Sequence, residues 1–353
     1  MENNLPNFAK RLPDGRVALY LDNVLLSTFV ECERKFNYRR MQNWVPKATM
    51  GGSAAMQIGI WWSAALEKFY RGMMLYQNKV EDSVEPSLSF MLKCGAEAWV
   101  ELKMSLGERQ DGTSFEERFN SAFVKFRGEA GAMQMLSDYW NVHGERDAQH
   151  WRIIAMELGF GYGNEVPVHE DHDVVIYWCG RPDLVVYENN TDVLLCIDHK
   201  SKTYMKSNFI DCWKPHPQTA GYVYALGVLC KSLGYDREVD RCMISGAGQF
   251  VAERPRKVIP RFLRPRPHYN PEEISEWRIQ TSLKAQALWQ AVRTGTYIPH
   301  ESSCHIYAGC MYRNICNKPP STRSIILNAD FVKIEPWAPY VKTDLEGDEE
   351  NGQ

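Results

Sequence analysis

The stretches Gly180-Arg181-Pro182-Asp183 and Cys196-Ile197-Asp198-His199-Lys200 decide the fold of this 353-residue chain. Each adjoins an apolar run typical of a strand, and the residues between the two runs are rich in turn formers, which predicts a hairpin. Because side chains alternate between the faces of a strand, Asp198 and Lys200 are expected on one face, roughly 7 Å apart along the strand. The hairpin then brings Asp183 beside Asp198.

A pair of carboxylates beside a lysine has a defined chemistry. Carboxylate oxygens are ligands for hard divalent cations, and a neighbouring lysine can orient or deprotonate a water that attacks phosphorus. An Asp-x-Lys triplet by itself is more often part of a solvated strand or turn. Here it follows the apolar run 193–197, and a charged pair at the end of a buried strand is costly to desolvate. The pattern therefore favours a site for metal-assisted phosphodiester hydrolysis.

The composition is that of a globular protein. The chain is 44% hydrophobic and 12% aromatic, and its length suffices for one large or two modest domains with buried cores. It contains no apolar run long enough to span a membrane, and residues 1–6 lack the features of a secretory signal. We therefore expect a cytoplasmic protein with no membrane partner. In a reducing compartment, its ten cysteines are expected to be metal ligands or core residues.

Charge is distributed unevenly along the chain. The net charge is −3, but residues 341–353 hold five acids and one lysine, so the rest of the chain carries about +1. A basic stretch without acids lies at 254–268. Its cationic residues are Arg254, Arg256, Lys257, Arg261, Arg264 and Arg266. Such a stretch suits contacts with the phosphates of DNA; a solvated surface segment is the alternative.

Periodicity divides the chain into five regions. They are an N-terminal segment (1–50), a helical subdomain (51–150), a core of strands and helix (151–250), a region with the basic stretch, a long helix and clustered cysteines (251–318), and an acidic, partly disordered tail (319–353). Strands are expected over 152–160, 173–179, 184–187, 193–200 and 241–245, and helices over 27–43, 57–74, 114–139, 218–233 and 271–294. Ser27 is the expected N-cap of the first helix, and the chain beyond 317 is expected to be extended. This order predicts a mixed α/β (α+β) fold with a small central sheet flanked by helices.

A second candidate metal site lies near the C-terminus. Cys304, Cys310 and Cys316 are separated by five residues each, in a polar and turn-like segment. Three thiolates need a fourth ligand, which could be His305, a distant cysteine or an open position. Zinc is compatible with sulfur and nitrogen ligands, and an iron–sulfur cluster held by four thiolates is equally compatible. Small buried core residues are the alternative interpretation.

Taken in order, the motifs resemble those of RecB-like nucleases of the PD-(D/E)xK superfamily. The similarity is greatest to the iron–sulfur branch, which includes CRISPR-associated RecB-like exonucleases, the AddB nuclease domain and phage exonucleases. The matching motifs are C-x-R-x-F-x-Y at 32–38, G-x-x-x-H-x-x-L-E at 59–67, an acid at Glu157, G-x-x-D at 180–183, D-x-K at 198–200, Q-x-x-x-Y at 218–222 and the closing cysteines. The chain departs from the family at Ser63, which occupies the position of a metal-binding histidine.

The resemblance implies a restriction-endonuclease-like core over 151–250 with assigned site residues. Asp183, Asp198 and the backbone carbonyl of His199 would bind Mg²⁺ or Mn²⁺, and Lys200 would orient the attacking water. The remaining implied site residues are Glu157 and Glu67, as outer or second-metal ligands, and Gln218 and Tyr222, which would hold the motif or the DNA strand. The resemblance also implies a 4Fe–4S cluster that staples the two ends of the chain, with Cys32, Cys304, Cys310 and Cys316 as its ligands and zinc as the alternative occupant.

The implied function is that of a Mg²⁺- or Mn²⁺-dependent deoxyribonuclease. The enzyme would be an exonuclease acting on DNA ends or single strands in replication, recombination or repair, in a bacterial or phage-infected cell. A helicase or a recombination or replication protein is the expected partner, because no phosphate-binding glycine loop is visible. The alternative is a DNA-binding accessory protein whose nuclease site is weak or lost, as Ser63 suggests. A zinc-structured scaffold without a nucleic-acid role is a third hypothesis.

Overall fold

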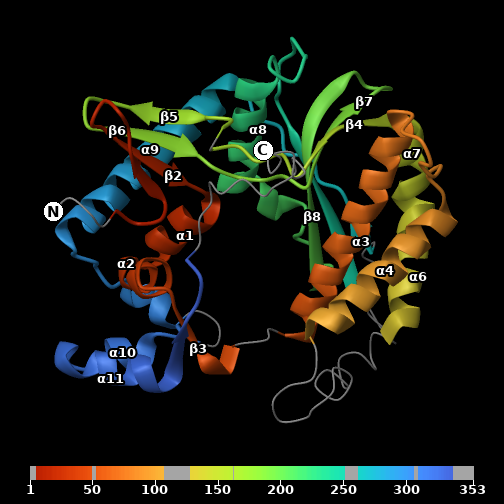
Figure 1. The fold of residues 1–353 in the computed structure, drawn as a ribbon. Helices are drawn as coiled ribbons and strands as arrows, with labels where there is room; N and C mark the ends of the chain where they lie inside the picture. Colours follow the sequence, from red (N-terminus) through yellow and green to blue (C-terminus); the bar gives the residue numbers. More distant parts are fainter. Residues whose placement is uncertain are drawn as a thin grey trace, which may run out of the picture. The chain divides into compact units, whose positions relative to one another are not determined.

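The computed structural model describes residues 5–49, 53–106, 128–161, 163–250, 261–305 and 309–336. The chain divides into two compact units, each assembled from distant segments. Unit 1 comprises 1–50, 159–181 and 271–353, and unit 2 comprises 51–158 and 182–270. Both are drawn in Figure 1. No helix among the described residues is long and apolar enough to cross a lipid bilayer.

Unit 2 is built on a five-stranded mixed sheet. Its strand order is β10 (Phe262–Leu263), β9 (Cys242–Phe250), β8 (Val193–Tyr204), β7 (Leu184–Glu188) and β4 (Trp151–Met156). The neighbours β8 and β9 run parallel, whereas the other pairs are antiparallel. The mixed α/β fold with a small central sheet, predicted from the order of elements, is confirmed.

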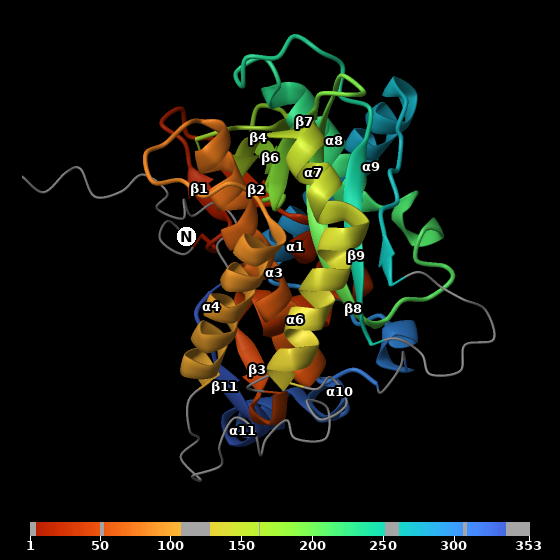
Figure 2. The same cartoon turned by 90° about the vertical axis from the view of Figure 1, so that its right-hand side faces the viewer.

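Helices cover both faces of this sheet (Figures 1 and 2). One face packs against α3 (Ala54–Gln77), α4 (Leu88–Leu106), α6 (Gly128–Tyr139) and α7 (Glu145–His150), with the π-helical η3 (Trp140–Gly144) before α7. The long α3 buries Trp61, Trp62, Leu66 and Phe69 at helical spacing, and they share one core with Ile197 of β8. The other face carries α8 (Pro217–Leu229), preceded by η4 (Asp211–Trp213).

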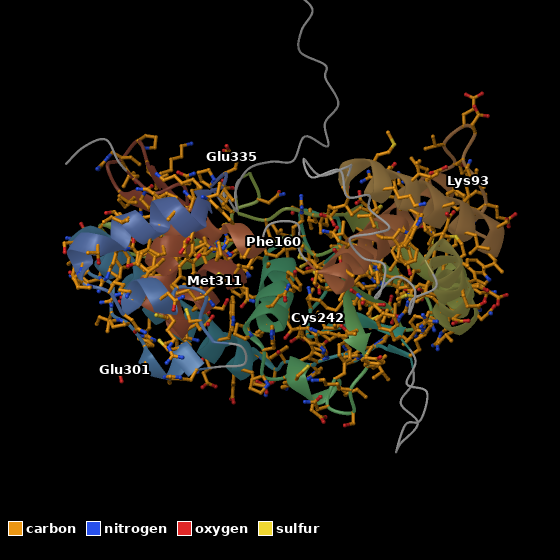
Figure 3. The ribbon with its side chains drawn as sticks, turned by 90° about the horizontal axis from the view of Figure 1, so that it is seen from below. Lys93, Phe160, Cys242, Glu301, Met311 and Glu335 are labelled. Atoms are coloured by element: carbon orange, nitrogen blue, oxygen red, sulfur yellow. The ribbon has the colours of Figure 1, made fainter. Side chains whose placement is uncertain are left out.

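Strand alternation in β8 explains this division. Leu195 and Ile197 belong to the core beneath α3, whereas the thiol of Cys196 lies 3.9 Å from the carbonyl of Tyr222 in α8. Cys242 of β9, labelled in Figure 3, likewise faces α8, with its thiol 3.8 Å from the carbonyl of Thr219. Asp198 therefore faces α8, and His199 faces the α3 layer.

Unit 1 contains a four-stranded sheet and a two-stranded sheet. The first has the order β1 (Ala9–Arg11), β2 (Val17–Leu21), β6 (Val174–Trp178) and β5 (Pro167–Glu170), and the second pairs β11 (Phe331–Lys333) with β3 (Trp44–Pro46). Its helices are α1 (Asn23–Glu31), α2 (Glu33–Phe36), η1 (Asn37–Met41), η2 (Lys47–Thr49), α9 (Pro271–Thr294), η5 (Glu301–His305), α10 (Arg313–Cys316) and α11 (Pro320–Asp330).

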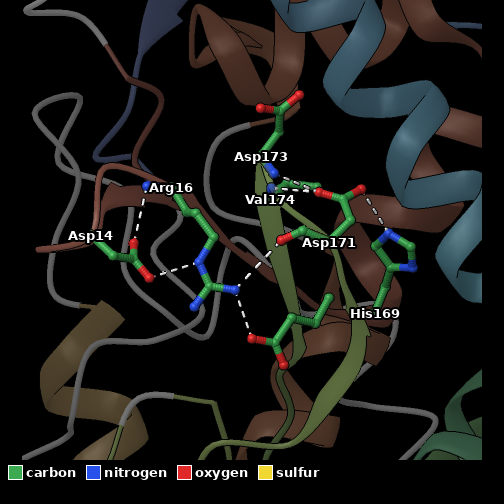
Figure 4. A network of polar contacts seen from close by, with 7 residues as sticks. Asp14, Arg16, His169, Asp171, Asp173 and Val174 are labelled. Atoms are coloured by element: carbon green, nitrogen blue, oxygen red, sulfur yellow. Dashed lines mark hydrogen bonds and ion pairs between the residues drawn. The ribbon is translucent and has the colours of Figure 1, made fainter.

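A polar network braces the four-stranded sheet at one end (Figure 4). The guanidinium of Arg16 contacts Asp14 at 2.7 Å and Glu170 at 2.6 Å, which joins the start of β2 to the end of β5. The carboxylate of Asp171 accepts hydrogen bonds from the backbone N–H groups of Asp173 and Val174, both at 2.8 Å, and so closes the β5–β6 turn. These contacts set the register of the edge strand.

The structure corrects two expectations about unit 1. The first helix begins at Asn23 instead of Ser27, because Asp22 caps it by accepting the Leu25 N–H at 2.7 Å. The chain beyond 317 is not simply extended: it contains α11 and β11, because Leu327 and Phe331 bury their side chains against other parts of unit 1. The helix expected over 114–139 is described only from Gly128 onward, and residues 337–353 lie outside the described residues.

Candidate active site

The β7–β8 hairpin brings Asp183 and Asp198 together. In its register Leu184 is opposite Ile197, so Asp183, one residue earlier, is placed opposite Asp198, one residue later. The carboxylate of Asp183 also accepts a short hydrogen bond from the backbone N–H of His199. The two acids therefore face one another at the start of β7, as the hairpin pattern predicts.

This pair is electrostatically strained in the absence of a cation. The side chain of Asp198 is only 6% exposed. Burial, followed by the charge of Asp198, raises the pKa of the Asp183 carboxyl to about 8, while the His199 N–H and Lys200 act in the opposite direction. Two carboxylates that face one another away from bulk water cannot both ionise freely. A bound cation or proton is therefore needed between them.

Residues of α8 and β8 orient the Asp198 carboxylate. Its Oδ1 atom accepts hydrogen bonds from Gln218 Nε2 at 3.3 Å and from the Tyr222 hydroxyl at 3.1 Å. Gln218 and Tyr222 are also hydrogen-bonded to each other at 2.8 Å, since they lie one turn apart on α8. On the other oxygen, Lys200 Nζ lies 2.5 Å from Oδ2. The first oxygen is thus held by the protein, and the second faces the partly exposed lysine.

The donor set fits a magnesium-like cation. Asp198 Oδ2 is buried and accepts no hydrogen bond within the described residues, so the ion pair with Lys200 is its main interaction. Among those residues, no group of three or more His, Cys, Asp or Glu side chains could hold a metal ion. Mg²⁺ is usually bound through one or two carboxylates, with waters and substrate oxygens completing its octahedron. The facing carboxylates of Asp183 and Asp198 meet that requirement.

The other acids expected at the site differ in placement. Glu157 lies close to Asp183: its backbone N–H donates to the Asp183 carbonyl at 3.0 Å, and its charge contributes to the raised pKa of Asp183. Glu67 is exposed on α3 and forms an ion pair with Arg71 at 2.8 Å. It lines a groove that also includes Lys200 and Ser63. The structure therefore groups Glu157 with the Asp183–Asp198 pair and places Glu67 in the adjoining groove.

The His199 side chain points away from the acids. Its ring stacks on that of Tyr70 in α3, with centroids 5.6 Å apart and planes inclined by 14°. Burial lowers the pKa of this imidazole to about 3, so the ring is neutral at physiological pH. Only the backbone of His199 is available to the site, as strand alternation predicts.

The basic stretch is occupied by contacts within unit 2. Arg261 pairs with Asp138 at 2.6 Å, Arg264 with Asp147 at 2.6 Å and Arg266 with Glu188 at 2.6 Å. The Arg264 side chain is 11% exposed and that of Asp147 is 2% exposed. These guanidinium groups brace the helical layer and the sheet instead of forming a free cationic surface. The predicted contacts Arg254, Arg256 and Lys257 lie outside the described residues.

The four cysteines proposed as ligands come near one another within unit 1. Cys304 accepts the Cys310 N–H at 3.3 Å through its carbonyl, and the His300 N–H lies 3.5 Å from Cys32 Sγ. Burial raises the pKa of the Cys310 thiol, with Cys304 and Cys32 adding to the shift. Burial likewise raises the pKa of Cys316, where Cys310 and Cys32 add to it. The thiols are thus near enough to interact electrostatically, although no group of three or more potential metal ligands is found among the described side chains.

The other six cysteines were expected in the core. Cys94, Cys179, Cys196, Cys230 and Cys242 are buried, but Cys212 is exposed. The groove beside Lys200 was not predicted from the sequence, although the spacing of Met56 and Ile60 places them on one helix face, where both are half exposed.

Comparison with known proteins identifies the family. The family model of the PD-(D/E)XK nuclease superfamily matches residues 25–317. A search of curated proteins found no significant match. The matched range includes the Asp183–Asp198 pair, Lys200 and α8, whose geometry is described above. The chain therefore belongs to the PD-(D/E)XK nuclease superfamily.

Proposed function

We propose that this protein is a Mg²⁺- or Mn²⁺-dependent deoxyribonuclease that acts as an exonuclease on DNA ends or single strands. Members of the superfamily are usually nucleases. The observation that carries the proposal is the pair Asp183–Asp198, in which burial raises the pKa of the Asp183 carboxyl and Lys200 Nζ lies 2.5 Å from Asp198 Oδ2. Strongly perturbed carboxyl pKa values beside a specific charged partner are a feature of catalytic sites.

Each side chain of the site has a role in the proposed hydrolysis. Asp183, Asp198 and the carbonyl of His199 would hold the cation, which when bound supplies Lewis acidity and lowers the pKa of water. Gln218 and Tyr222 orient Asp198 so that its Oδ2 is directed toward Lys200. Lys200 positions the attacking water and donates a hydrogen bond to the charge that develops on the phosphate. The water oxygen bonds to phosphorus, the phosphorus–oxygen bond to the leaving group breaks, and the leaving oxygen takes up a proton.

Two further acids are proposed as outer ligands. Glu157 is supported by its effect on the pKa of Asp183. Glu67 is supported by its place in the groove that contains Lys200. Because Glu67 already pairs with Arg71, we assign it the more distant position. A helicase or a recombination or replication protein is the proposed partner, and replication, recombination or repair is the proposed context.

We also propose that Cys32, Cys304, Cys310 and Cys316 hold a 4Fe–4S cluster in unit 1, with zinc as the alternative. The proposal is supported by the electrostatic influence of these thiols on one another, since Cys32 adds to the raised pKa of both Cys310 and Cys316, and four thiolates are the usual ligands of such a cluster. Protein purified without oxygen should be brown and contain iron. Cys316→Ser should lose iron and colour, whereas Cys212→Ser, at an exposed cysteine, should retain both. Zinc without iron in the anaerobic protein would contradict the cluster.

A second candidate function is that of a DNA-binding accessory protein with little nuclease activity. The observation that favours it is Ser63, which lines the groove at the position of the family histidine. A serine hydroxyl is a poorer metal ligand than an imidazole. This function predicts salt-dependent DNA binding without cleavage at any concentration of divalent metal.

The deciding experiment is digestion of end-labelled single-stranded and duplex DNA with Mg²⁺, Mn²⁺ or EDTA. We expect metal-dependent release of nucleotides from one end, and loss of at least about 100-fold in rate for Lys200→Ala. Lys231→Ala is the matched control, because Lys231 pairs with Asp236 at an exposed site of the same unit. Activity that persists in Lys200→Ala would rule out the proposed mechanism, and binding without cleavage by the unmodified chain would favour the second candidate.

A further inference from the structure

A second cavity lies in unit 2, at the end of the β7–β8 hairpin that is remote from Asp183. Its volume is about 480 Å³, which is within the range of sites for small molecules. Tyr187 lines this cavity and follows Asp183 by four residues along β7, a distance of roughly 13 Å. The cavity is therefore separate from the proposed active site.

Strand pairing brings Arg152 and Tyr187 together at the cavity. They are direct partners in the register of β7 with β4, the edge strand of the sheet. Their neighbours Ile153 and Val186 belong to the core beneath α3, so alternation directs Arg152 and Tyr187 to the face that carries α8. Tyr235, from the loop after α8, completes the group: Arg152 Nη2 donates a hydrogen bond to its hydroxyl at 2.5 Å, and its ring centre lies 5.6 Å from that of Tyr187.

Two acids balance the other cations around the cavity. Asp192, in the β7–β8 turn, accepts hydrogen bonds from the Tyr187 hydroxyl and from Arg237 Nη1. The guanidinium of Arg237 also contacts the Asp192 carbonyl at 3.2 Å and lies 5.5 Å from the ring centre of Tyr187, so this wall is held in place. Asp236 lines the cavity as well, and it pairs with Lys231 at 3.4 Å. These two ion pairs leave no net charge of their own.

Arg152 supplies the uncompensated charge. Its guanidinium lies 5.4 Å from the ring centre of Tyr187 and 5.7 Å from that of Tyr235. Within the part of the chain that the structure describes, the Tyr235 hydroxyl is its only hydrogen-bond partner and no carboxylate pairs with it. A guanidinium has five N–H donors, so most of them remain for a ligand. The side-chain amide of Asn189 lines the same cavity and likewise makes no hydrogen bond to a described residue.

We propose that this cavity binds a nucleoside monophosphate, with its phosphate on Arg152 and the Asn189 amide and its base against the exposed ring of Tyr235. A guanidinium can donate to two phosphate oxygens at once, and an aromatic side chain can stack on any base. Space is available beside Gly234, where an added Cβ would meet no atom within 4 Å. The site does not depend on the proposed nuclease function, and none of its residues belongs to the motifs at 180–183, 198–200 or 218–222.

Isothermal titration calorimetry of the full-length protein in EDTA tests this site. EDTA removes divalent cations, and without a cation the facing carboxylates of Asp183 and Asp198 repel a phosphate, so binding at the catalytic pair is suppressed. We expect thymidine monophosphate to bind with a dissociation constant below about 1 mM. Thymidine and inorganic phosphate, which each lack one half of the ligand, should bind at least about tenfold more weakly.

Two variants separate ligand contacts from effects on folding. Arg152→Gln should weaken binding of thymidine monophosphate at least about tenfold, because it removes the charged donor. Asn189→Asp changes an exposed side chain with almost no change in shape, and its carboxylate should weaken binding to a similar extent by repelling the phosphate. Arg146→Gln, at an exposed arginine of α7 that does not line the cavity, is the matched control and should bind normally. Urea unfolding of each variant verifies that the fold is retained.

The possible results decide the inference in either direction. Absence of binding at about 1 mM thymidine monophosphate, unchanged affinity in either cavity variant, or an equal loss in Arg146→Gln would overturn it. Equal affinity for inorganic phosphate would overturn the base contact with Tyr235. A 5′-phosphorylated oligothymidylate that binds at least about tenfold more tightly than the mononucleotide would overturn the assignment to a free nucleotide and place a strand end in the cavity.

Discussion

The proton on Asp183 leads to a specific prediction about metal binding. Burial and the charge of Asp198 raise the pKa of this carboxyl to about 8, so it is mostly protonated in the metal-free protein at neutral pH. A cation bound between the two acids must displace that proton. Apparent affinity for Mg²⁺ or Mn²⁺ should therefore increase with pH up to about 8 and then level off.

The magnitude follows from this pKa. With one proton displaced, affinity should rise about ninefold from pH 6 to 7 and about fivefold from pH 7 to 8. Stability of the metal-free protein should change in the opposite direction. The pKa is raised in the folded state from 3.8, so the stabilising contribution of the proton is complete below about pH 4 and is lost as pH rises toward 8. The slope should be at most about 1.4 kcal/mol per pH unit in the free energy of unfolding.

The informative variant is Asp183→Asn, whose amide oxygen can still accept the His199 N–H. It should bind metal weakly, release no proton on binding, and be more stable than the unmodified chain at pH 8 without metal. Calorimetry in buffers of different ionisation enthalpy measures the proton release, and urea unfolding from pH 5 to 8.5 measures stability. Asp236→Asn, at a carboxylate that is 90% exposed, is the control. A flat affinity between pH 6 and 8, or an unchanged slope in Asp183→Asn, would refute this reasoning.

Three further predictions concern packing. Asp147→Asn should lower the free energy of unfolding by about 3–5 kcal/mol in urea titrations, because it leaves the charge of the buried Arg264 unpaired. The double variant Asp147→Leu/Arg264→Met should be much less destabilised. If both variants lose the same free energy of unfolding, the ion-pair explanation is contradicted. Gly59→Ala should lower the free energy of unfolding, measured thermally, by about 1–3 kcal/mol, because the added Cβ would contact Ser201 Oγ. Adding Ser201→Ala to the same chain should restore part of that free energy. Asp22→Ala should lower the free energy of unfolding by about 1 kcal/mol through loss of the α1 cap, whereas Ser27→Ala, whose hydroxyl donates to the Val24 carbonyl, should change it by less than about 0.5 kcal/mol. A larger effect at Ser27 would mean that the cap is misassigned.

Much of the candidate site was predictable because it depends on local geometry. Alternation along β8 places Asp198 and Lys200 together, and the hairpin adds Asp183 from fifteen residues earlier. Helical spacing places Gln218 and Tyr222 on one face of α8, and both reach Asp198. The long helix α9 likewise has the bounds expected from its pattern, Pro271–Thr294. Such features need only a strand, a short turn or a single helix.

The arginines of the basic stretch could not be assigned from local sequence patterns. Arg261, Arg264 and Arg266 read as a free basic patch, but each meets a carboxylate 78 to 123 residues away. No spacing rule links Arg264 to Asp147, since their pairing depends on how the helical layer packs on the sheet. Helix α11 was missed for a similar reason, because its burial of Leu327 depends on partners such as Tyr38 at the other end of the chain.

By itself, the amino-acid sequence determined the mixed α/β class, the acidic pair with its lysine, and the family to which these motifs belong. Only the tertiary structure decided that burial and the charge of Asp198 raise the pKa of Asp183 to about 8, and that the arginines pair with carboxylates of the fold. The physical reason is the distance along the chain over which each effect acts. Backbone periodicity acts over a few residues and can be read along the chain, whereas desolvation, ion pairing and groove shape arise from segments that meet only in the folded protein.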